Sequence, residues 1–152
     1  MIRYFAFYNS ADPSGAVLYV NAMPVEDADA MLAGDPSLRY VEVGGLIDTG
    51  DFYVQGGVLM PKQILGVTFD KVEILANGVD TATMTSGLPA GTSITLLGDL
   101  YTPGGREDYG VPEMSMTYSS GPFVLTSNTR GPHRLRFEAT NYLPEEVLID
   151  VI

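Results

Sequence analysis

The segment His133-Arg-Leu-Arg-Phe-Glu-Ala139 has the pattern of a β-strand and indicates the fold class of this chain. In it Leu135, Phe137 and Ala139 alternate with charged residues, which is the two-residue period of a β-strand with one buried and one solvated face. A strand of this kind needs a second layer to cover its apolar face. We therefore expect at least two packed layers of strands around it.

Similar short apolar segments recur on both sides of this stretch, from Val67 to the C-terminus. They are spaced about 8–12 residues apart, a spacing typical of a small β-sandwich. The strands that we predict in this region cover residues 72–75, 82–85, 93–97, 114–118, 123–126, 134–139 and 146–151.

The first sixty residues have a different pattern of predicted elements, with one helical segment among short strands. Residues 2–9 and 16–23 flank a turn that contains Pro13 and Gly15, which predicts an antiparallel hairpin. Residues 24–33 carry acids at their start and are followed by Gly34, so we expect a short helix there. Further short strands are predicted over residues 38–43, 52–54 and 58–60.

The succession of short apolar segments and turns is interrupted near residues 61–66, where we place a domain boundary. The fold class predicted for the whole chain is mainly β. It comprises a small N-terminal β-rich docking module with one short helix over residues 1–62, followed by an immunoglobulin-like β-sandwich domain over residues 63–152.

Composition narrows the classes of function. The 152 residues carry a formal net charge of −11, which repels nucleic-acid phosphates and anionic lipid, so no nucleic-acid partner is expected. There is no cysteine, which excludes disulfide scaffolds, thiolate metal sites and cysteine nucleophiles. The sequence also predicts no secretory signal and no membrane span, because apolar runs are short.

The residues able to do chemistry do not form a recognisable catalytic set. His133 is the single histidine and has no nearby acid at triad or metal spacing, and no Gly-x-Ser-x-Gly elbow follows a strand. The acids of 48–51 lack the spacing of a calcium loop, and adjacent acids such as Glu145 and Glu146 point to opposite faces of a strand. We therefore predict no catalytic residues, no cofactor, no metal and no enzymatic activity.

Two groups of aromatic residues are candidate contact sites. The cluster of Tyr4, Phe5, Phe7 and Tyr8 forms a protein contact if the predicted hairpin lies at an open sheet edge, and it is core if the hairpin is covered. The segment 101–118 reads as a long loop, a common place for binding residues. Its tyrosines form the second group, the candidate ligand contacts Tyr101, Tyr109 and Tyr118.

One stretch resembles the opening of bacterial immunoglobulin-like domains. Val72-Glu-Ile-Leu-Ala-Asn-Gly-Val-Asp-Thr-Ala-Thr-Met-Thr85 is similar to their Asp-Gly-x-x-x-Ala-Thr-(Ile/Val)-Thr hairpin, with Asn77-Gly78 in place of Asp-Gly. Either dipeptide suits a turn with positive φ. The resemblance implies a hairpin between the first strands of the domain.

Other motifs resemble small structural proteins of tailed phages and prophages. The C-terminal domain of those proteins is similar to Gly87-Leu-Pro-Ala-Gly91, to residues 123–131 and to residues 134–147. Their N-terminal modules end in a hairpin similar to Asp51-Phe-Tyr-Val-Gln-Gly-Gly-Val-Leu-Met-Pro61. Together the motifs touch about half of the chain.

The resemblance implies a virion component assembled in the host cytoplasm, attached to the tail or tail fibres through its N-terminal module. Partners would be other tail, fibre or capsid subunits and further copies of the chain in a homo-oligomer or a symmetric array. A capsid decoration protein on the head and a module that binds host-surface glycans remain as alternatives.

Overall fold

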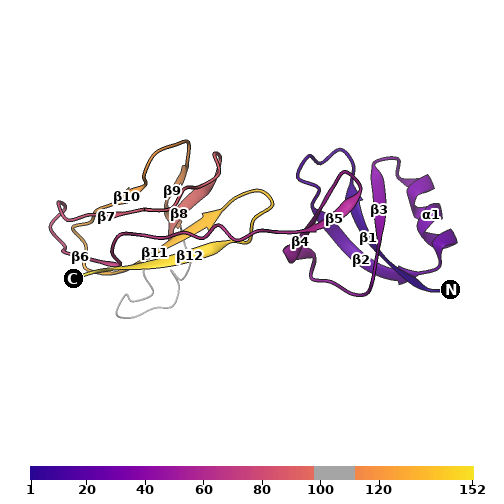
Figure 1. Ribbon diagram of the computed structural model, residues 1–152, viewed down its shortest axis with the longest axis horizontal. Coiled ribbons are helices and arrows are strands. Elements are labelled where there is room, and N and C mark those ends of the chain that lie inside the picture. The colour runs from indigo at the N-terminus through magenta and orange to yellow at the C-terminus, as the bar shows by residue number, and fades with distance from the viewer. Residues whose placement is uncertain (98–111) are drawn as a thin grey trace. The chain divides into compact units, whose positions relative to one another are not determined.

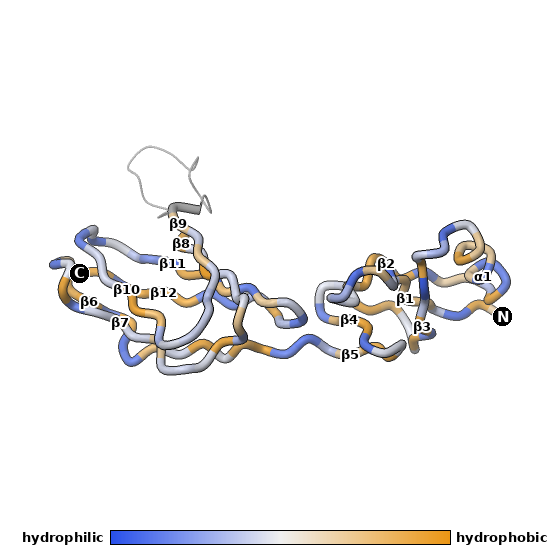
Figure 2. Tube along the Cα trace, turned by 90° about the horizontal axis from the view of Figure 1, so that it is seen from above, coloured by the Kyte–Doolittle hydropathy of each residue, from blue (hydrophilic) through white to orange (hydrophobic). Residues whose placement is uncertain are grey.

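The computed structural model describes residues 1–97 and 112–152. The chain divides into two compact units, Met1–Gln63 and Ile64–Ile152. The described residues are mainly β with one short α-helix, which confirms the predicted fold class (Figure 1). In Figure 2 the chain turns hydrophilic directly after β5 (Val58–Pro61), where the first unit ends.

The N-terminal unit is built on a three-stranded antiparallel sheet in the order β2-β1-β3. A separate antiparallel hairpin pairs β4 with β5. The elements of this unit are β1 (Arg3–Asn9), β2 (Val17–Met23), α1 (Val25–Gly34), β3 (Leu38–Val43), the 3-10 turn η1 (Thr49–Asp51), β4 (Phe52–Gln55) and β5 (Val58–Pro61).

Both faces of the three-stranded sheet are covered. On one face Phe5 and Phe7 pack with Ala28 of α1. On the other face Ala6 packs with Val54 of β4. Successive residues of β1 point to opposite faces, so this single strand supplies both cores. Complete burial of two phenylalanines is worth about 1.5–3 kcal/mol each before conformational entropy is subtracted.

The C-terminal unit contains a five-stranded sheet in the order β6-β12-β11-β8-β9 and a two-stranded sheet that pairs β10 with β7. Neighbouring strands are antiparallel except β6, which runs parallel to β12. The strands are β6 (Glu73–Ile74), β7 (Ala82–Thr83), β8 (Ser93–Leu97), β9 (Pro112–Thr117), β10 (Val124–Leu125), β11 (Gly131–Glu138) and β12 (Glu145–Val151).

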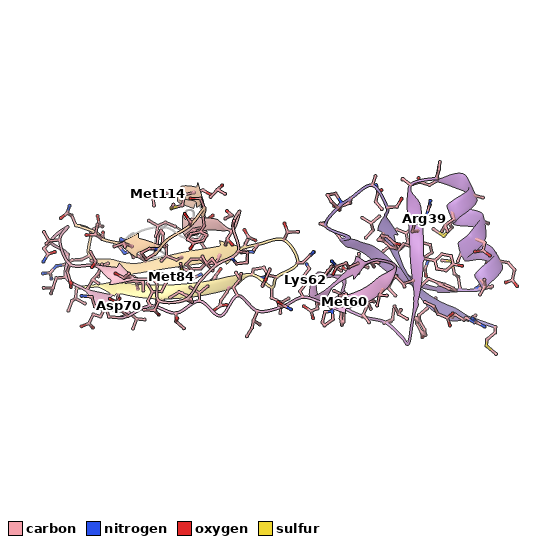
Figure 3. All side chains as sticks on the ribbon, turned by 45° about the horizontal axis from the view of Figure 1, so that its top comes forward. Arg39, Met60, Lys62, Asp70, Met84 and Met114 are labelled. Carbon is pink, nitrogen blue, oxygen red and sulfur yellow. The ribbon has the colours of Figure 1, made fainter. Side chains whose placement is uncertain are left out.

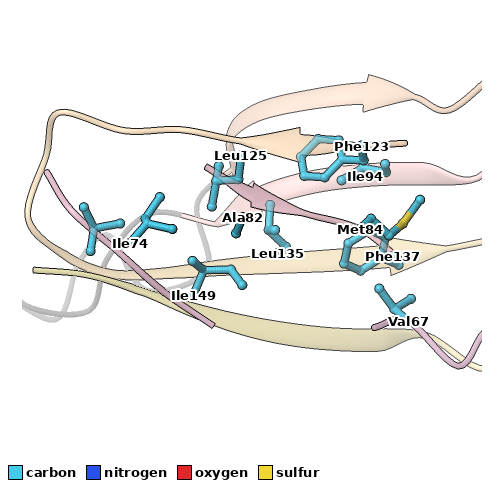
Figure 4. Packing of buried hydrophobic residues seen from close by; sticks show 11 residues of the cluster. Val67, Ile74, Ala82, Met84, Ile94, Phe123, Leu125, Leu135, Phe137 and Ile149 are labelled. Carbon is cyan, nitrogen blue, oxygen red and sulfur yellow. The ribbon is translucent and has the colours of Figure 1, made fainter. Parts of the chain in front are cut away.

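The two sheets of this unit enclose one core, as in a β-sandwich (Figure 4). Ala82 and Leu125 come from the small sheet, and Leu135 and Phe137 come from the large one. The ring of Phe137 meets that of Phe123 at 90°, with the ring centroids 6.4 Å apart, an edge-to-face contact. The alternation in residues 133–139 thus marks the central strand of the sandwich.

The predicted hairpin between residues 72–75 and 82–85 is not formed. Strand β6 pairs with β12, and β7 pairs with β10 in the other sheet, so the connection between β6 and β7 crosses from one sheet to the other. The Asn77 side chain accepts hydrogen bonds from the backbone amides of Val79 and Asp80, at 2.9 and 2.8 Å, and Gly78 has a φ of 66°. The turn chemistry was predicted correctly, but the partners of its strands were not.

Candidate functional site

The two phenylalanines of the β1 aromatic cluster lie in the core of the N-terminal unit. Strand β1 is the central strand of its sheet, hydrogen-bonded to β2 on one side and to β3 on the other, so it offers no open edge. Phe5 is 1% exposed and Phe7 is fully buried. Phe7 stacks on Tyr19 with the ring centroids 4.9 Å apart. Of the two alternatives for Phe5 and Phe7, the structure therefore favours the core, because α1 covers them and β1 is paired on both sides.

Tyr4 and Tyr8 are half-buried on the opposite face of β1. Tyr8 packs against the core formed by Ala6, Val17 and Val54. Tyr8 thus contributes to the interior of the N-terminal unit together with Phe5 and Phe7.

The edges of the three-stranded sheet are β2 and β3, and both carry features that discourage pairing with another strand. Residue Leu18 of β2 is skipped in the register with β1 and forms a bulge. The side chain of Asn21 accepts a hydrogen bond of 2.9 Å from the amide of Ala22. Strand β3 presents the charged residues Arg39 and Glu42.

Of the three candidate tyrosines in segment 101–118, Tyr118 directly follows β9 and can be placed, while Tyr101 and Tyr109 lie outside the described residues. The Tyr118 hydroxyl donates to the carbonyl of Gly121 at 2.7 Å, and its ring packs against the sandwich core. A half-buried ring held at both ends anchors the chain after β9. This geometry does not favour Tyr118 as a stacking platform for a sugar.

Strand β9 is the last strand of the five-stranded sheet among the described residues. Its methionines Met114 and Met116 are 49% and 42% exposed. Figure 3 places Met114 at the margin of the C-terminal unit and Met84 in its interior. A hollow of about 230 Å³ next to this strand is lined by Met116, Tyr118 and Phe123, among other residues.

Sequence reasoning missed a hydrogen bond between His133 and Ser127. The His133 Nε2 atom lies 3.0 Å from the Ser127 hydroxyl, and Nδ1 lies 3.0 Å from the carbonyl of Gly131. A carbonyl oxygen only accepts, so Nδ1 carries a proton, and in the neutral imidazole Nε2 is then an acceptor for the Ser127 hydroxyl, which also has the Thr129 carbonyl within 3.3 Å. Only the short separation of six residues around a Gly-Pro turn hinted at this pair in the sequence.

A serine that donates to a histidine is the start of a nucleophile and base pair. Here a backbone carbonyl orients the imidazole. No carboxylate is among the described hydrogen-bond partners of His133. The Thr129 amide also donates to the Ser127 hydroxyl oxygen at 3.0 Å, so the serine is fastened into the turn. The pair ties the turn before β11 to that strand, beside a hollow of about 310 Å³ lined by Leu97 and Arg130, among other residues.

Several carboxylates are engaged in local structure. The pKa of Asp80 is lowered, first by the Lys71 ammonium that donates to it and then by the amide of Leu75. Hydrogen bonds from Ser14 and Ser37 lower the pKa values of Asp12 and Asp35 in the same way. These acids stabilise turns in their ionised form.

The acids of α1 and of the turn before β4 do not build a cation site. Asp29 accepts a hydrogen bond of 2.8 Å from the hydroxyl of Tyr40, which raises the pKa of the tyrosine, with burial adding to the effect. Asp48 accepts from the amide of Gly50 at 2.9 Å and so caps η1. Residues 1–97 and 112–152 contain no group of three or more His, Asp or Glu residues placed to hold a metal ion.

No helix in the described part of the chain is long and apolar enough to cross a membrane. The sequence matches no protein-family model and none of the curated proteins.

Proposed function

We propose that the chain is a non-enzymatic structural component of a tailed-phage virion, attached to the tail or tail fibres through its N-terminal unit. The observation that carries the proposal is the separation of two sequence motifs into two compact units. The motif of residues 51–61 lies on the β4–β5 hairpin that ends the first unit, and the motifs from residue 72 onward lie in the second.

The architecture of the second unit supports an immunoglobulin-like projecting domain. Two sheets share one core, and the larger sheet combines antiparallel pairs with the parallel pair β6–β12. Such sandwiches occur in adhesion, decoration and scaffolding proteins alike, so the fold supports a structural role by analogy. The proposal of a virion role rests on the sequence motifs as well as on the fold.

The roles of the polar side chains are consistent with a structural protein. Glu145 accepts hydrogen bonds from the amides of Gly66 and Val67, at 2.9 and 3.0 Å, and so fastens the chain where the sandwich begins. Glu146 faces Arg134 and Arg136 across the sheet, at 3.7 and 3.8 Å. The adjacent acids thus act separately and hold strands in place.

The partners in this proposal are other virion proteins and further copies of the chain. In a symmetric particle many weak contacts act together, so each copy needs only a modest interface. A decoration protein would attach through the same kind of weak, repeated contacts, but on the capsid instead of the tail. Glycan binding is less well supported, because Tyr118 is tied to Gly121.

Immunogold electron microscopy of purified phage particles tests the proposal. An antibody raised against the chain is expected to label tails or tail fibres, and pre-incubation of the antibody with the purified protein should remove the label. Label over the head would support the decoration alternative. Particles from a host that expresses the gene, without label anywhere, would contradict the proposal.

A further inference from the structure

Asn77 is the only one of the asparagines of this chain that is followed by a glycine. In an Asn-Gly pair the backbone nitrogen of the glycine can attack the side-chain carboxamide of the asparagine, because glycine has no side chain to hinder the approach. Asn77 is exposed in the connection between β6 and β7, where water reaches its side chain. The pair is therefore a candidate site of spontaneous deamidation.

This reaction needs only base and water. After the Gly78 amide has lost its proton, its nitrogen forms a bond with the carboxamide carbon of Asn77. The bond from that carbon to Nδ2 breaks, and the amino group takes up a proton and leaves as ammonia. Water then opens the cyclic imide at either of its carbonyls, which leaves an aspartate or an isoaspartate in place of the asparagine. Both products carry an added negative charge.

In the folded chain the attacking nitrogen is engaged elsewhere. The Gly78 amide donates to the carbonyl of Ser127 at 3.1 Å. The Asn128 side chain lies against the same glycine, since a Cβ atom on Gly78 would be 2.6 Å from Asn128 Oδ1. An amide that is hydrogen-bonded and covered gives up its proton only when the local structure opens, as in hydrogen exchange. The contact between Gly78 and Ser127 therefore opposes the first step of the reaction.

The hydrogen bonds to the Asn77 side chain have the opposite effect. Its Oδ1 accepts from the amides of Val79 and Asp80, at 2.9 and 2.8 Å. Donors on a carbonyl oxygen stabilise the negative charge that develops there when a nucleophile attacks the carbon. The turn thus favours attack on the carboxamide, so protection depends on the Gly78 amide and its contact with Ser127.

We propose that Asn77 is a deamidation site controlled by this contact: the closed contact protects it, and local opening of the contact allows the modification. The carbonyl partner is itself held by a turn, in which the Ser127 hydroxyl lies 3.0 Å from His133 Nε2 and accepts from the Thr129 amide at 3.0 Å. Loosening that turn frees the Gly78 amide. The inference does not depend on the virion proposal, since deamidation is measured on the purified protein.

The modification would make the opening permanent. An isoaspartate carries the main chain through the former side-chain carbon, which lengthens the backbone of the turn. The Gly78 amide then cannot meet Ser127 in the same register. Chains modified at Asn77 should therefore exchange the amide of Gly78 faster than unmodified chains do.

Incubation of the purified chain in mildly alkaline buffer, with and without urea, tests the protection. Peptide mass spectrometry measures aspartate and isoaspartate formed from Asn77. We expect the folded chain to deamidate there at least about ten times more slowly than the chain unfolded in urea. Asn141 is the internal control and should react slowly in both conditions, because the side chain of Tyr142 hinders the attack. Equal rates at Asn77 with and without urea would overturn the proposal.

Two variants separate local opening from unfolding of the whole unit. Ser127→Ala loosens the turn that holds the carbonyl partner of Gly78, so deamidation of Asn77 should become roughly two- to tenfold faster. Tyr118→Phe removes the hydrogen bond to the carbonyl of Gly121 in the same unit and should leave the rate unchanged. Equal acceleration in both variants, or acceleration in neither, would overturn the proposal.

A measurement on the natural chain replaces the variants if Ser127→Ala does not fold. Hydrogen exchange of the Gly78 amide, followed by NMR, reports opening of its contact with Ser127. We expect this exchange and the deamidation of Asn77 to accelerate in parallel as the temperature rises. Deamidation that does not follow the exchange of the Gly78 amide would overturn the proposal.

Discussion

Among the glycines of the N-terminal unit, Gly15 is the one where an added methyl group would meet the closest neighbouring atom. It lies in the turn between β1 and β2 with a φ of 65°. A Cβ atom there would lie 1.9 Å from the carbonyl oxygen of Val54, a backbone atom. The carbonyl of Gly15 also accepts a hydrogen bond of 2.8 Å from the Val54 amide. Gly15→Ala therefore forces β4 away from the start of β2.

The size of the effect follows from two contributions. A left-handed conformation costs a residue with a side chain about 1–2 kcal/mol. Separating the backbones breaks the Gly15–Val54 hydrogen bond and disturbs the packing of Val54, which adds roughly 2–3 kcal/mol. The sum, about 3–5 kcal/mol, compares with a stability of roughly 3–9 kcal/mol for a unit of 63 residues. We expect Gly15→Ala to leave the N-terminal unit only marginally folded.

Gly56→Ala is the matched control, since Gly56 has a φ of 59° and its Cβ would meet no atom within 4 Å. It should lose only the conformational contribution of about 1–2 kcal/mol. Urea unfolding gives the free-energy differences, and hydrogen exchange read by mass spectrometry shows which unit has opened. Equal losses for the two variants would refute the assignment of the steric contribution to the contact with Val54.

Three further predictions concern the C-terminal unit. Phe137→Ala should lower its free energy of unfolding by about 3–5 kcal/mol in urea titrations, because the side chain is fully buried; a loss below about 1 kcal/mol would contradict the described core. Because the pKa of Asp80 is lowered in the folded state, its carboxylate stabilises the fold at pH values above its ordinary pKa of 3.8, and this stabilisation is lost as the pH falls through the native pKa. Asp80→Asn should therefore weaken the dependence of the melting temperature on acid pH. If the melting temperatures of the variant and of the natural chain fall equally as the pH is lowered, the contact between Asp80 and Lys71 is contradicted. Ser127→Ala should cost about 0.5–1.5 kcal/mol in thermal melts by leaving His133 without its donor, and an unchanged melting temperature would argue against that hydrogen bond.

Local patterns predicted the elements well. The alternation around Phe137 identified β11, and the acids followed by Gly34 identified α1, observed over Val25–Gly34. The Asn77-Gly78 dipeptide identified a turn with positive φ. Each of these features depends on residues close together in the sequence, where spacing and turn chemistry determine the structure.

Pairing between distant segments was not predictable in the same way. The covering of β1 depends on β3, which reaches it only after the intervening helix, and this decides whether Phe5 and Phe7 are surface or core. Likewise the partner of β6 is β12, at the other end of the unit. Alternation tells which residues share a face, but it does not name the strand that lies alongside.

Quantitative mass spectrometry of phage particles purified through a density gradient tests the structural role most directly. A structural component of the virion should give peptides from both units at a fixed copy number per particle, tens or fewer on a tail and hundreds on a head, and this number should persist after washing in high salt. Finding the chain in infected cells but not in the purified particles, or at a copy number that varies with washing, would contradict it.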